Sequence, residues 1–181
     1  MKYKIQDIAK WFIGKEVMSL GKLQCLCYYS YSWYLAEKDE RLFDEKFEAW
    51  VHVPTSVELR SSVDDFFDVK SVEGSVKTLD VNTISFLQEV WDAYGELSKY
   101  ELEGMISQEH PYRQTRKGLD VFEICNETLS DDDMILEYRY RNLKEFILQG
   151  GDIDSLVYEM VSYFSNEELI GMVEVINKGI K

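Results

Sequence analysis

Apolar residues recur at helical spacing along most of this chain, and the densest run is residues 22–36, KLQCLCYYSYSWYLA. Apolar and aromatic side chains occupy nearly every side of a helix built from this run. A helix that is apolar on all sides usually forms the centre of a globular domain, and about fifteen residues are too few to span a bilayer. We therefore predict a central helix here, with Ser19 as its N-cap. The predicted core residues are Leu23, Leu26, Tyr28, Tyr29, Trp33, Leu35, Trp50 and Trp91.

Further helices are predicted from the same periodicity and from capping residues. Gly14 and Gly95 each follow an apolar helical stripe and mark its end. Asn82 or Thr83 is expected to open the helix that ends at Gly95, and Ser98 begins a capping box. The expected helices cover residues 5–13, 19–36, 55–62, 82–95, 98–107, 130–150, 152–164 and 165–176.

The remaining segments predict little regular structure. Residues 47–53, FEAWVHV, alternate and are rich in aromatic and β-branched side chains, which favours a short strand or extended segment that Pro54 ends. Residues 64–81 have no clear period and predict a loop, with room for a short hairpin. Pro111 is expected to interrupt the helical pattern. The chain as a whole predicts a mainly α fold: a compact multi-helix domain around the central aromatic helix, with at most a few short strands.

The charge pattern divides the chain after residue 118. Residues 119–181 hold most of the net charge of −14, and their expected helices have broad apolar faces. We therefore expect a helical core over residues 1–118 and an acidic helical C-terminal extension over residues 119–181. The extension is expected to pack on the core or to continue it.

The acidic composition narrows the range of partners. A chain with net charge −14 and a pI near 4.6 repels nucleic acid and anionic membranes in general. It suits a protein partner with a basic surface, so we expect nucleic acid only through such a partner and no membrane association. The same charge also keeps a protein soluble without any partner. Charged residues recur through the first fourteen positions, which predicts neither a signal peptide nor a membrane anchor.

The cysteines and the absence of several known motifs restrict the kinds of reaction and ligand that we expect. Cys25, Cys27 and Cys125 form no CxxC pair, and we expect buried free thiols in a reducing cytoplasm. The sequence has no phosphate-binding glycine loop, GxSxG, HExxH or EF-hand motif, and two histidines are too few for a His-rich metal site. We expect no cofactor and no metal. A carboxylate-only magnesium site stays open, although runs of acids are usually solvated faces or N-caps. Its alternative locations are Asp64, Asp65 and Asp68, or Asp131, Asp132 and Asp133.

One cluster mixes an acid, an imidazole and cations within nine residues. Glu109, His110, Arg113 and Arg116 are the candidate catalytic residues of a metal-independent ribonuclease, in which imidazole and carboxylate move protons and arginines hold phosphate. The simpler interpretation is a corner between helices with surface charges. We favour the corner, because spacing within one short turn does not establish convergence in space. An enzyme is therefore the less favoured class.

Two further groups of side chains have a structural and a functional interpretation. The aromatic residues of the central helix resemble a base-stacking platform, but no basic residue is interleaved among them, so core packing is preferred. Those residues are Tyr28, Tyr29, Tyr31, Trp33 and Tyr34. His52 lies in an apolar extended segment, and we expect a buried, hydrogen-bonded imidazole rather than a catalytic one.

Four segments in a fixed order carry a family resemblance. DIAKWFI, KLQCLCYYSYSWYLA, FEAWVHVPTSVEL and ELEGMISQEHPYRQTRKG together resemble the Panacea domain, over roughly residues 5–140. The positions that match its aromatic-helix pattern and the segment after it are Leu23, Gln24, Leu26, Tyr28, Tyr29, Leu35, Phe47, Ala49 and Pro54. The chain departs from the pattern at Val53 and Thr55, which flank Pro54, and at Ser107, which stands where the family has a motif histidine.

The resemblance implies a neutralising protein rather than an enzyme. Panacea-type proteins include SocA-like antitoxins and phage-associated proteins that bind unrelated toxins, often through added terminal segments, and one type acts as a proteolytic adaptor. By resemblance, partner choice belongs to the acidic C-terminal extension. The candidate partner-binding residues are Asp131, Asp132, Asp133, Glu167 and Glu168.

Three hypotheses stay open at this point. The first is an antitoxin-like binding protein that neutralises a basic protein target such as a toxin. The second is an anti-CRISPR inhibitor of a Cas9-type RNA-guided nuclease, which would occupy the nuclease's nucleic-acid channel or promote cleavage of its guide RNA. The third is a ribonuclease that uses the 109–117 cluster on RNA held by a partner.

Overall fold

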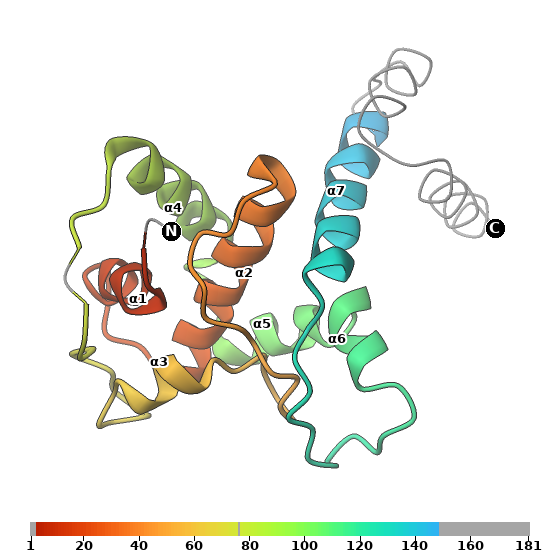
Figure 1. Ribbon diagram of the computed structural model, residues 1–181, viewed down its shortest axis with the longest axis horizontal. Coiled ribbons are helices and arrows are strands. Elements are labelled where there is room, and N and C mark those ends of the chain that lie inside the picture. The colour runs from red at the N-terminus through yellow and green to blue at the C-terminus, as the bar shows by residue number, and fades with distance from the viewer. Residues whose placement is uncertain (1–2, 76, 149–181) are drawn as a thin grey trace. The chain divides into compact units, whose positions relative to one another are not determined.

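Seven helices make up most of the part of the chain that the structure describes, residues 3–75 and 77–148 of a computed structural model (Figure 1). The mainly α prediction is therefore confirmed. The helices are α1 (Ile5–Ile13), α2 (Leu20–Lys38), α3 (Val57–Ser61), α4 (Val81–Tyr94), α5 (Lys99–Ile106), α6 (His110–Thr115) and α7 (Asp131–Leu148). The helices expected over residues 152–164 and 165–176 lie outside the described residues.

The chain divides into two compact units, Met1–Glu137 and Tyr138–Lys181, with the boundary inside α7. The first unit therefore includes residues 119–137, which the charge pattern had assigned to the acidic extension. Backbone hydrogen bonds explain this: Ala49 N–H donates to the Glu127 carbonyl (2.9 Å) and Leu129 N–H donates to the Phe47 carbonyl (2.8 Å). The segment before α7 is thus held to residues 47–49 of the core.

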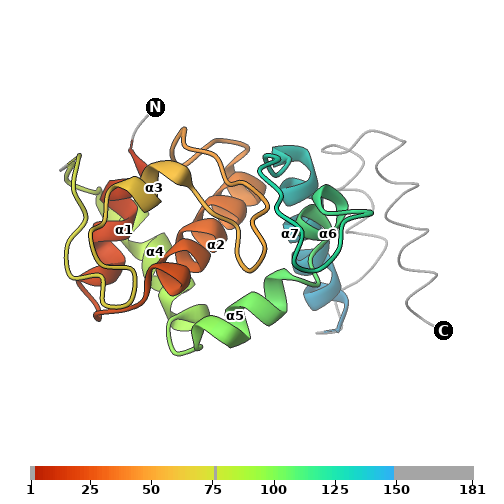
Figure 2. The ribbon, with the colours of Figure 1, turned by 90° about the horizontal axis from the view of Figure 1, so that it is seen from below.

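The central position predicted for the aromatic helix is confirmed. α2 packs against α1, α4 and α5, and the views in Figures 1 and 2 both place it amid the other helices of the first unit. Leu23, Leu26, Tyr28 and Tyr29 are fully buried, and Leu35 is nearly so. A helix surrounded on most sides has no use for a polar face, which accounts for its nearly uniform apolar pattern.

The three tryptophans of the predicted core are only half-buried. Trp33 donates its indole N–H to the Tyr94 hydroxyl (2.9 Å), and Trp50 donates to the Glu48 carboxylate (2.7 Å). An indole N–H needs a polar partner, so a large ring with one polar atom settles at the edge of a core more readily than at its centre. Trp91 also lies at this edge.

Aromatic rings of α2 pack against one another and against rings from other segments. Tyr29 stacks on Tyr94 with ring centroids 3.9 Å apart, and Tyr28 meets Phe47 edge to face at 5.6 Å. Tyr31 is likewise buried, beside Phe43. These rings are enclosed by protein, so the core interpretation of the aromatic run holds for the three tyrosines, and they offer no platform for bases.

Side-chain caps begin three helices that the sequence predicted. Ser19 and Ser56 accept backbone N–H groups at the starts of α2 and α3, and Ser98 forms the expected capping box with Glu101. The prediction for α4 was wrong by two residues. Its N-cap is Asp80, whose carboxylate accepts the Thr83 N–H at 2.8 Å, so neither Asn82 nor Thr83 opens the helix.

Two other local predictions need correction. Pro111 does not interrupt a helix but lies in the first turn of α6, where a missing N–H costs nothing. Residues 47–55 form no strand: Glu48 makes isolated bridges to Thr55 and Thr128 and closes a short loop at Pro54. The loop prediction for residues 64–81 is confirmed for its described residues up to Asp80, and within it Val69 bridges to Met18.

Candidate functional site

The four residues predicted to be catalytic do not converge on one site. Glu109 is fully buried and accepts the Tyr28 hydroxyl at 2.9 Å inside the core. His110 and Arg113 are exposed on the outer face of α6. Arg116 follows the last residue of α6 and donates to backbone carbonyl groups of two loops. Of the four, only His110 and Arg113 line one concave surface, whereas Glu109 is bonded inside the core and Arg116 is bonded to loop carbonyl groups.

Arg116 joins two loops instead of facing a substrate. Its Nη1 donates to the Ala49 carbonyl (2.8 Å), and its Nη2 donates to the carbonyls of Glu123 (2.7 Å), Val121 (3.2 Å) and Asp120 (3.3 Å). The rigid fork of a guanidinium makes such simultaneous bonds possible. One side chain at the C-terminal end of α6 thus joins residues 49–54 to residues 118–126, which we call the paired loops.

Tyr112 anchors the first of the paired loops from the same helix. Its hydroxyl lies against the carbonyl oxygens of Trp50 and Val51, at 2.9 Å from the latter. Burial, chiefly, raises the pKa of Tyr112 to about 12, so the phenol remains a protonated donor at neutral pH. The sequence missed the roles of Tyr112 and Arg116, because nothing in residues 109–117 reveals which carbonyl groups lie nearby.

The second of the paired loops exposes large apolar side chains. Val121, Phe122 and Ile124 are 73%, 77% and 79% exposed, although the backbone beneath them is bound by Arg116. The acids around them, Asp120, Glu123 and Glu127, are exposed as well. Water is a poor solvent for such side chains, and a fixed group of them on a surface usually marks an interaction site.

The first of the paired loops extends this surface. Phe122 lies edge to face with the His52 ring at 6.4 Å, and Arg60 lies over the Trp50 ring at 5.3 Å. His52 is exposed, and its Nδ1 is 2.8 Å from the Glu103 carboxylate. The expectation of a buried His52 was therefore wrong, since the loop that Glu48 and Thr55 close turns this side chain outward. Its hydrogen bond is present.

The acids at the start of α7 are not equally available to a partner. Asp131 accepts hydrogen bonds from Tyr31 (3.0 Å), from Arg41 (2.7 and 2.9 Å) and from Lys46. Asp131 is thus engaged in ion pairs within the protein and is not a free charge. Asp132 is exposed, and Asp133 lies 3.5 Å from His110 Nε2. Glu167 and Glu168 lie outside the described residues.

Low pH is expected to reduce the stability that Asp131 gains from its hydrogen bonds with Tyr31, Arg41 and Lys46. Burial by itself raises the pKa of Asp131, but the hydrogen bonds from Lys46, Arg41 and Tyr31 outweigh it, and the pKa lies below its ordinary 3.8. A lowered pKa stabilises the fold above the unfolded value, and this contribution disappears as pH falls through the folded value. Asp131→Asn should therefore lower the melting temperature at pH 7, and its effect should become smaller as the pH falls below 3.8 toward pH 3.

Thermal unfolding of the wild type and Asp131→Asn between pH 7 and pH 3 measures this difference. Asp132→Asn is the matched control, because its carboxylate is exposed and the same charge is removed. A difference between Asp131→Asn and the wild type that stays constant over this range would contradict the assignment of the carboxylate as the stabilising group.

A polar cleft lies between α6 and the start of α7. It encloses about 390 Å³. His110 donates its backbone N–H to the Glu137 carboxylate at 3.0 Å, which joins the two elements across the cleft. The lining residues are Gln108, His110, Arg113, Gln114, Lys117 and Glu137. Two of the predicted catalytic residues thus share this cleft with Lys117, a residue that the sequence had grouped with them.

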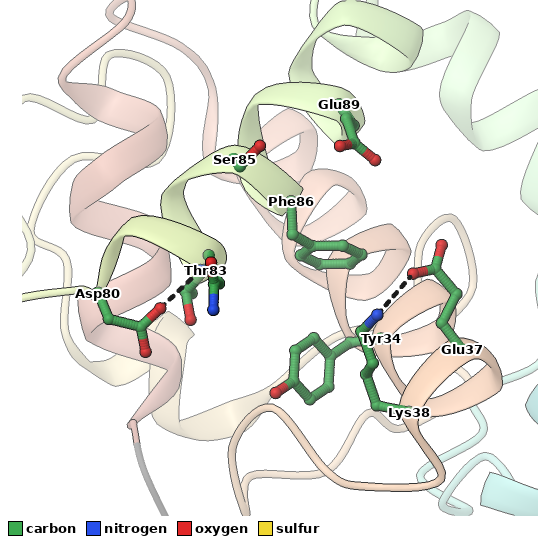
Figure 3. Close-up of a pocket in the computed structure, with 9 residues that line it drawn as sticks. Tyr34, Glu37, Lys38, Asp80, Thr83, Ser85, Phe86 and Glu89 are labelled. Carbon is green, nitrogen blue, oxygen red and sulfur yellow. Dashed lines mark hydrogen bonds and ion pairs between the residues drawn. The ribbon is translucent and has the colours of Figure 1, made fainter.

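A second hollow of about 430 Å³ lies between the end of α2 and the start of α4 (Figure 3). Tyr34 and Phe86 meet edge to face at 5.4 Å, and Lys38 pairs with Glu37 at 3.6 Å. Glu89 also lines this hollow. Apart from Tyr34 in the aromatic run, the sequence did not single out these residues, because they lie at the ends of two helices that only the fold brings together.

The described residues assemble no site for metal binding or for a reactive thiol. No group of three His, Cys, Asp or Glu side chains there can hold a metal ion. The thiols of Cys25, Cys27 and Cys125 are free and buried, as predicted, and burial raises the pKa of Cys25 and Cys27, so both stay protonated. Among residues 3–75 and 77–148, no helix is both long and apolar enough to cross a membrane.

The paired loops and the cleft are the two features with functional character. The first combines a fixed backbone with exposed apolar side chains, and the second combines cations with a concave shape. Both assignments depend on the geometry of this chain alone. No family model, curated protein or solved structure matches it.

Proposed function

We propose that this chain is an acidic binding protein that neutralises a protein target through the paired loops. The observation that carries the proposal is the second loop, in which Arg116 holds the backbone while Phe122 and Ile124 point into solvent. A preorganised loop loses little conformational entropy on binding, so its apolar side chains contribute more of their burial energy to affinity. Phe122 and Ile124 are the expected anchors, since interface energy concentrates in a few large side chains.

The charges around the anchors indicate the chemistry of the target. Exposed acids flank the apolar side chains at Asp120, Glu123 and Glu127, and the whole chain carries −14. A target with an apolar pocket bordered by lysines or arginines complements this arrangement and is steered toward it. A second copy of this chain does not, because two surfaces of the same high negative charge repel each other.

The resemblance to the Panacea domain gives the proposed role. Antitoxins of that kind bind and silence a toxin, and the resemblance covers roughly residues 5–140. The second of the paired loops, which carries Phe122 and Ile124, lies at the start of the segment beyond residue 118 that the resemblance implied for partner choice, and Arg116 attaches it to the core. We therefore propose an antitoxin-like protein in which the first part of this segment, together with residues 49–54, supplies the contact surface.

Affinity capture from a bacterial lysate tests the proposal when the bait is changed one residue at a time. Phe122→Ser and Ile124→Ser should each weaken capture of the target by roughly tenfold, about 1.4 kcal/mol, because each removes an apolar anchor. Tyr100→Ser is the matched control, since Tyr100 is 78% exposed on α5. The captured protein is identified by mass spectrometry, and its affinity for each variant is measured with the purified pair.

Two results support the proposal together. The captured protein should have a basic surface, and its toxicity to growing cells should be suppressed by the wild type and by Tyr100→Ser but not by Phe122→Ser. Equal binding by Phe122→Ser, Ile124→Ser and the wild type would overturn the paired loops as the binding surface. Binding without suppression of any activity would overturn the neutralising role.

A Cas9-type RNA-guided nuclease is the alternative target. Its nucleic-acid channel is basic, so the same complementarity applies, and an acidic protein there takes the place of phosphates. In vitro DNA cleavage by the guide-loaded nuclease distinguishes the two targets. Inhibition that Phe122→Ser abolishes would favour the nuclease over a toxin, and a shortened guide RNA would indicate cleavage instead of channel occupancy.

A further inference from the structure

The cleft between α6 and α7 gathers cations in a chain that has an excess of acids. Arg113 and Lys117 are four residues apart, and His110 precedes Arg113 by three, so their side chains lie on one face of α6 and the turn after it. All three are exposed. They line a concave space of about 390 Å³ together with the carboxamides of Gln108 and Gln114.

Neither of the two permanent cations is neutralised. Within residues 3–75 and 77–148, the Arg113 guanidinium and the Lys117 ammonium make no hydrogen bond or ion pair, whereas Arg41, Lys46, Lys22 and Lys99 each have an acidic partner. Two carboxylates lie near these cations: Glu137, which also lines the cleft, accepts the His110 backbone N–H, and Asp133 lies beside His110 Nε2. The two cations therefore keep their donors for a ligand.

We infer that this cleft is a binding site for a small phosphate-bearing ligand, held by Arg113 and Lys117. A guanidinium donates two parallel hydrogen bonds to one phosphate, and a nearby ammonium adds a second charge. The carboxamides of Gln108 and Gln114 supply further N–H donors, and Asp133 orients the His110 ring at the edge of the site. This inference goes beyond the proposed function, because the cleft and the paired loops use different side chains.

The overall charge restricts the ligand to a small one. A long nucleic-acid strand would extend beyond the two cations and meet the repulsion of a chain with net charge −14. A single phosphate group, either free or at the end of a small metabolite, meets only the local field of the cleft. The space of about 390 Å³ lies within the range for small-molecule sites.

The test is a titration of the isotope-labelled full chain, followed by amide NMR at constant ionic strength. The probes are inorganic phosphate, adenosine 5′-monophosphate and a single-stranded RNA hexamer without terminal phosphates. Inorganic phosphate and the mononucleotide should shift the signals of residues 108–117 in a saturable way. Arg113→Gln and Lys117→Gln should each weaken this binding by about tenfold, because each removes a charge-assisted donor.

Lys70→Gln is the matched control, since it removes one exposed positive charge from a distant loop and should leave the titration unchanged. Far-ultraviolet circular dichroism of each variant checks the fold. Absence of a saturable shift, or equal shifts in wild type and Arg113→Gln, would overturn the site. Tighter binding of the RNA hexamer than of the mononucleotide would overturn the small-ligand assignment in favour of a nucleic-acid contact.

Discussion

Replacing Arg116 with alanine is expected to lower the free energy of unfolding by about 2 kcal/mol and to release both of the paired loops. The guanidinium bonds four carbonyl groups, one from the first loop and three from the second. Its side chain is half-buried, so part of the lost hydrogen bonding is recovered from water, and the estimate stays well below the sum of four charged bonds.

Hydrogen–deuterium exchange and urea unfolding measure the two parts of this prediction. Amides of residues 118–126 should exchange faster in Arg116→Ala than in the wild type. Arg113→Ala is the matched control, because it removes a guanidinium from the same helix that makes no such bonds. Arg116→Lys keeps the positive charge but loses the forked guanidinium. Its loop exchange rates and its free energy of unfolding should therefore lie between those of Arg116→Ala and Arg113→Ala. Unchanged exchange in the loop would mean that other contacts hold it.

The loss of Arg116 also bears on target binding. Released loops must be ordered again when the target binds, and this entropy cost reduces affinity. Arg116→Ala should therefore weaken capture of the target although Phe122 and Ile124 remain present. A variant that loses loop order but keeps full affinity would show that preorganisation is not needed.

Replacing Gln24 with leucine is expected to lower the free energy of unfolding by about 2 kcal/mol, although the side-chain volume hardly changes. Gln24 is almost fully buried in α2, and its carboxamide pairs with the backbone of Ser56 in both directions, each at 2.9 Å. Leucine leaves the buried Ser56 N–H without this acceptor. The Ser56 carbonyl is affected less, because it also accepts the Arg60 N–H.

Urea unfolding of Gln24→Leu and of Gln114→Leu tests this expectation. Gln114 is exposed on α6, so the same substitution there should change the free energy of unfolding by less than about 0.5 kcal/mol. A loss below about 1 kcal/mol for Gln24→Leu would indicate that the Ser56 N–H finds another acceptor. The pairing also attaches the start of α3 to α2.

The local elements of the fold could be predicted because their signals are local. Ser19, Ser98 and the stripe from Ile5 to Ile13 act on backbone groups within one or two turns, so residue type and spacing suffice to place them. The start of α4 was missed for the opposite reason. Asp80 follows an irregular loop, and the Tyr3 hydroxyl that donates to its carboxylate at 2.9 Å comes from the far end of the chain.

The candidate site required the tertiary structure. The sequence grouped Glu109, His110, Arg113 and Arg116 by proximity along the chain, but a helix directs neighbouring residues to different sides. In the folded chain Glu109 is buried in the core and Arg116 donates to carbonyl groups of the paired loops. His110 and Arg113 line the cleft.

The sequence by itself therefore determined a mainly α, acidic protein built around one aromatic helix, because hydrophobic periodicity and charge are properties of the chain. Only the tertiary structure decided which side chains are exposed and which are paired. Asp131 became an internal ion pair once Arg41 and Lys46 came within reach, and Phe122 became exposed because Arg116 fixed the backbone below it. Hydrogen bonds between residues far apart in sequence depend on distances that no local pattern encodes.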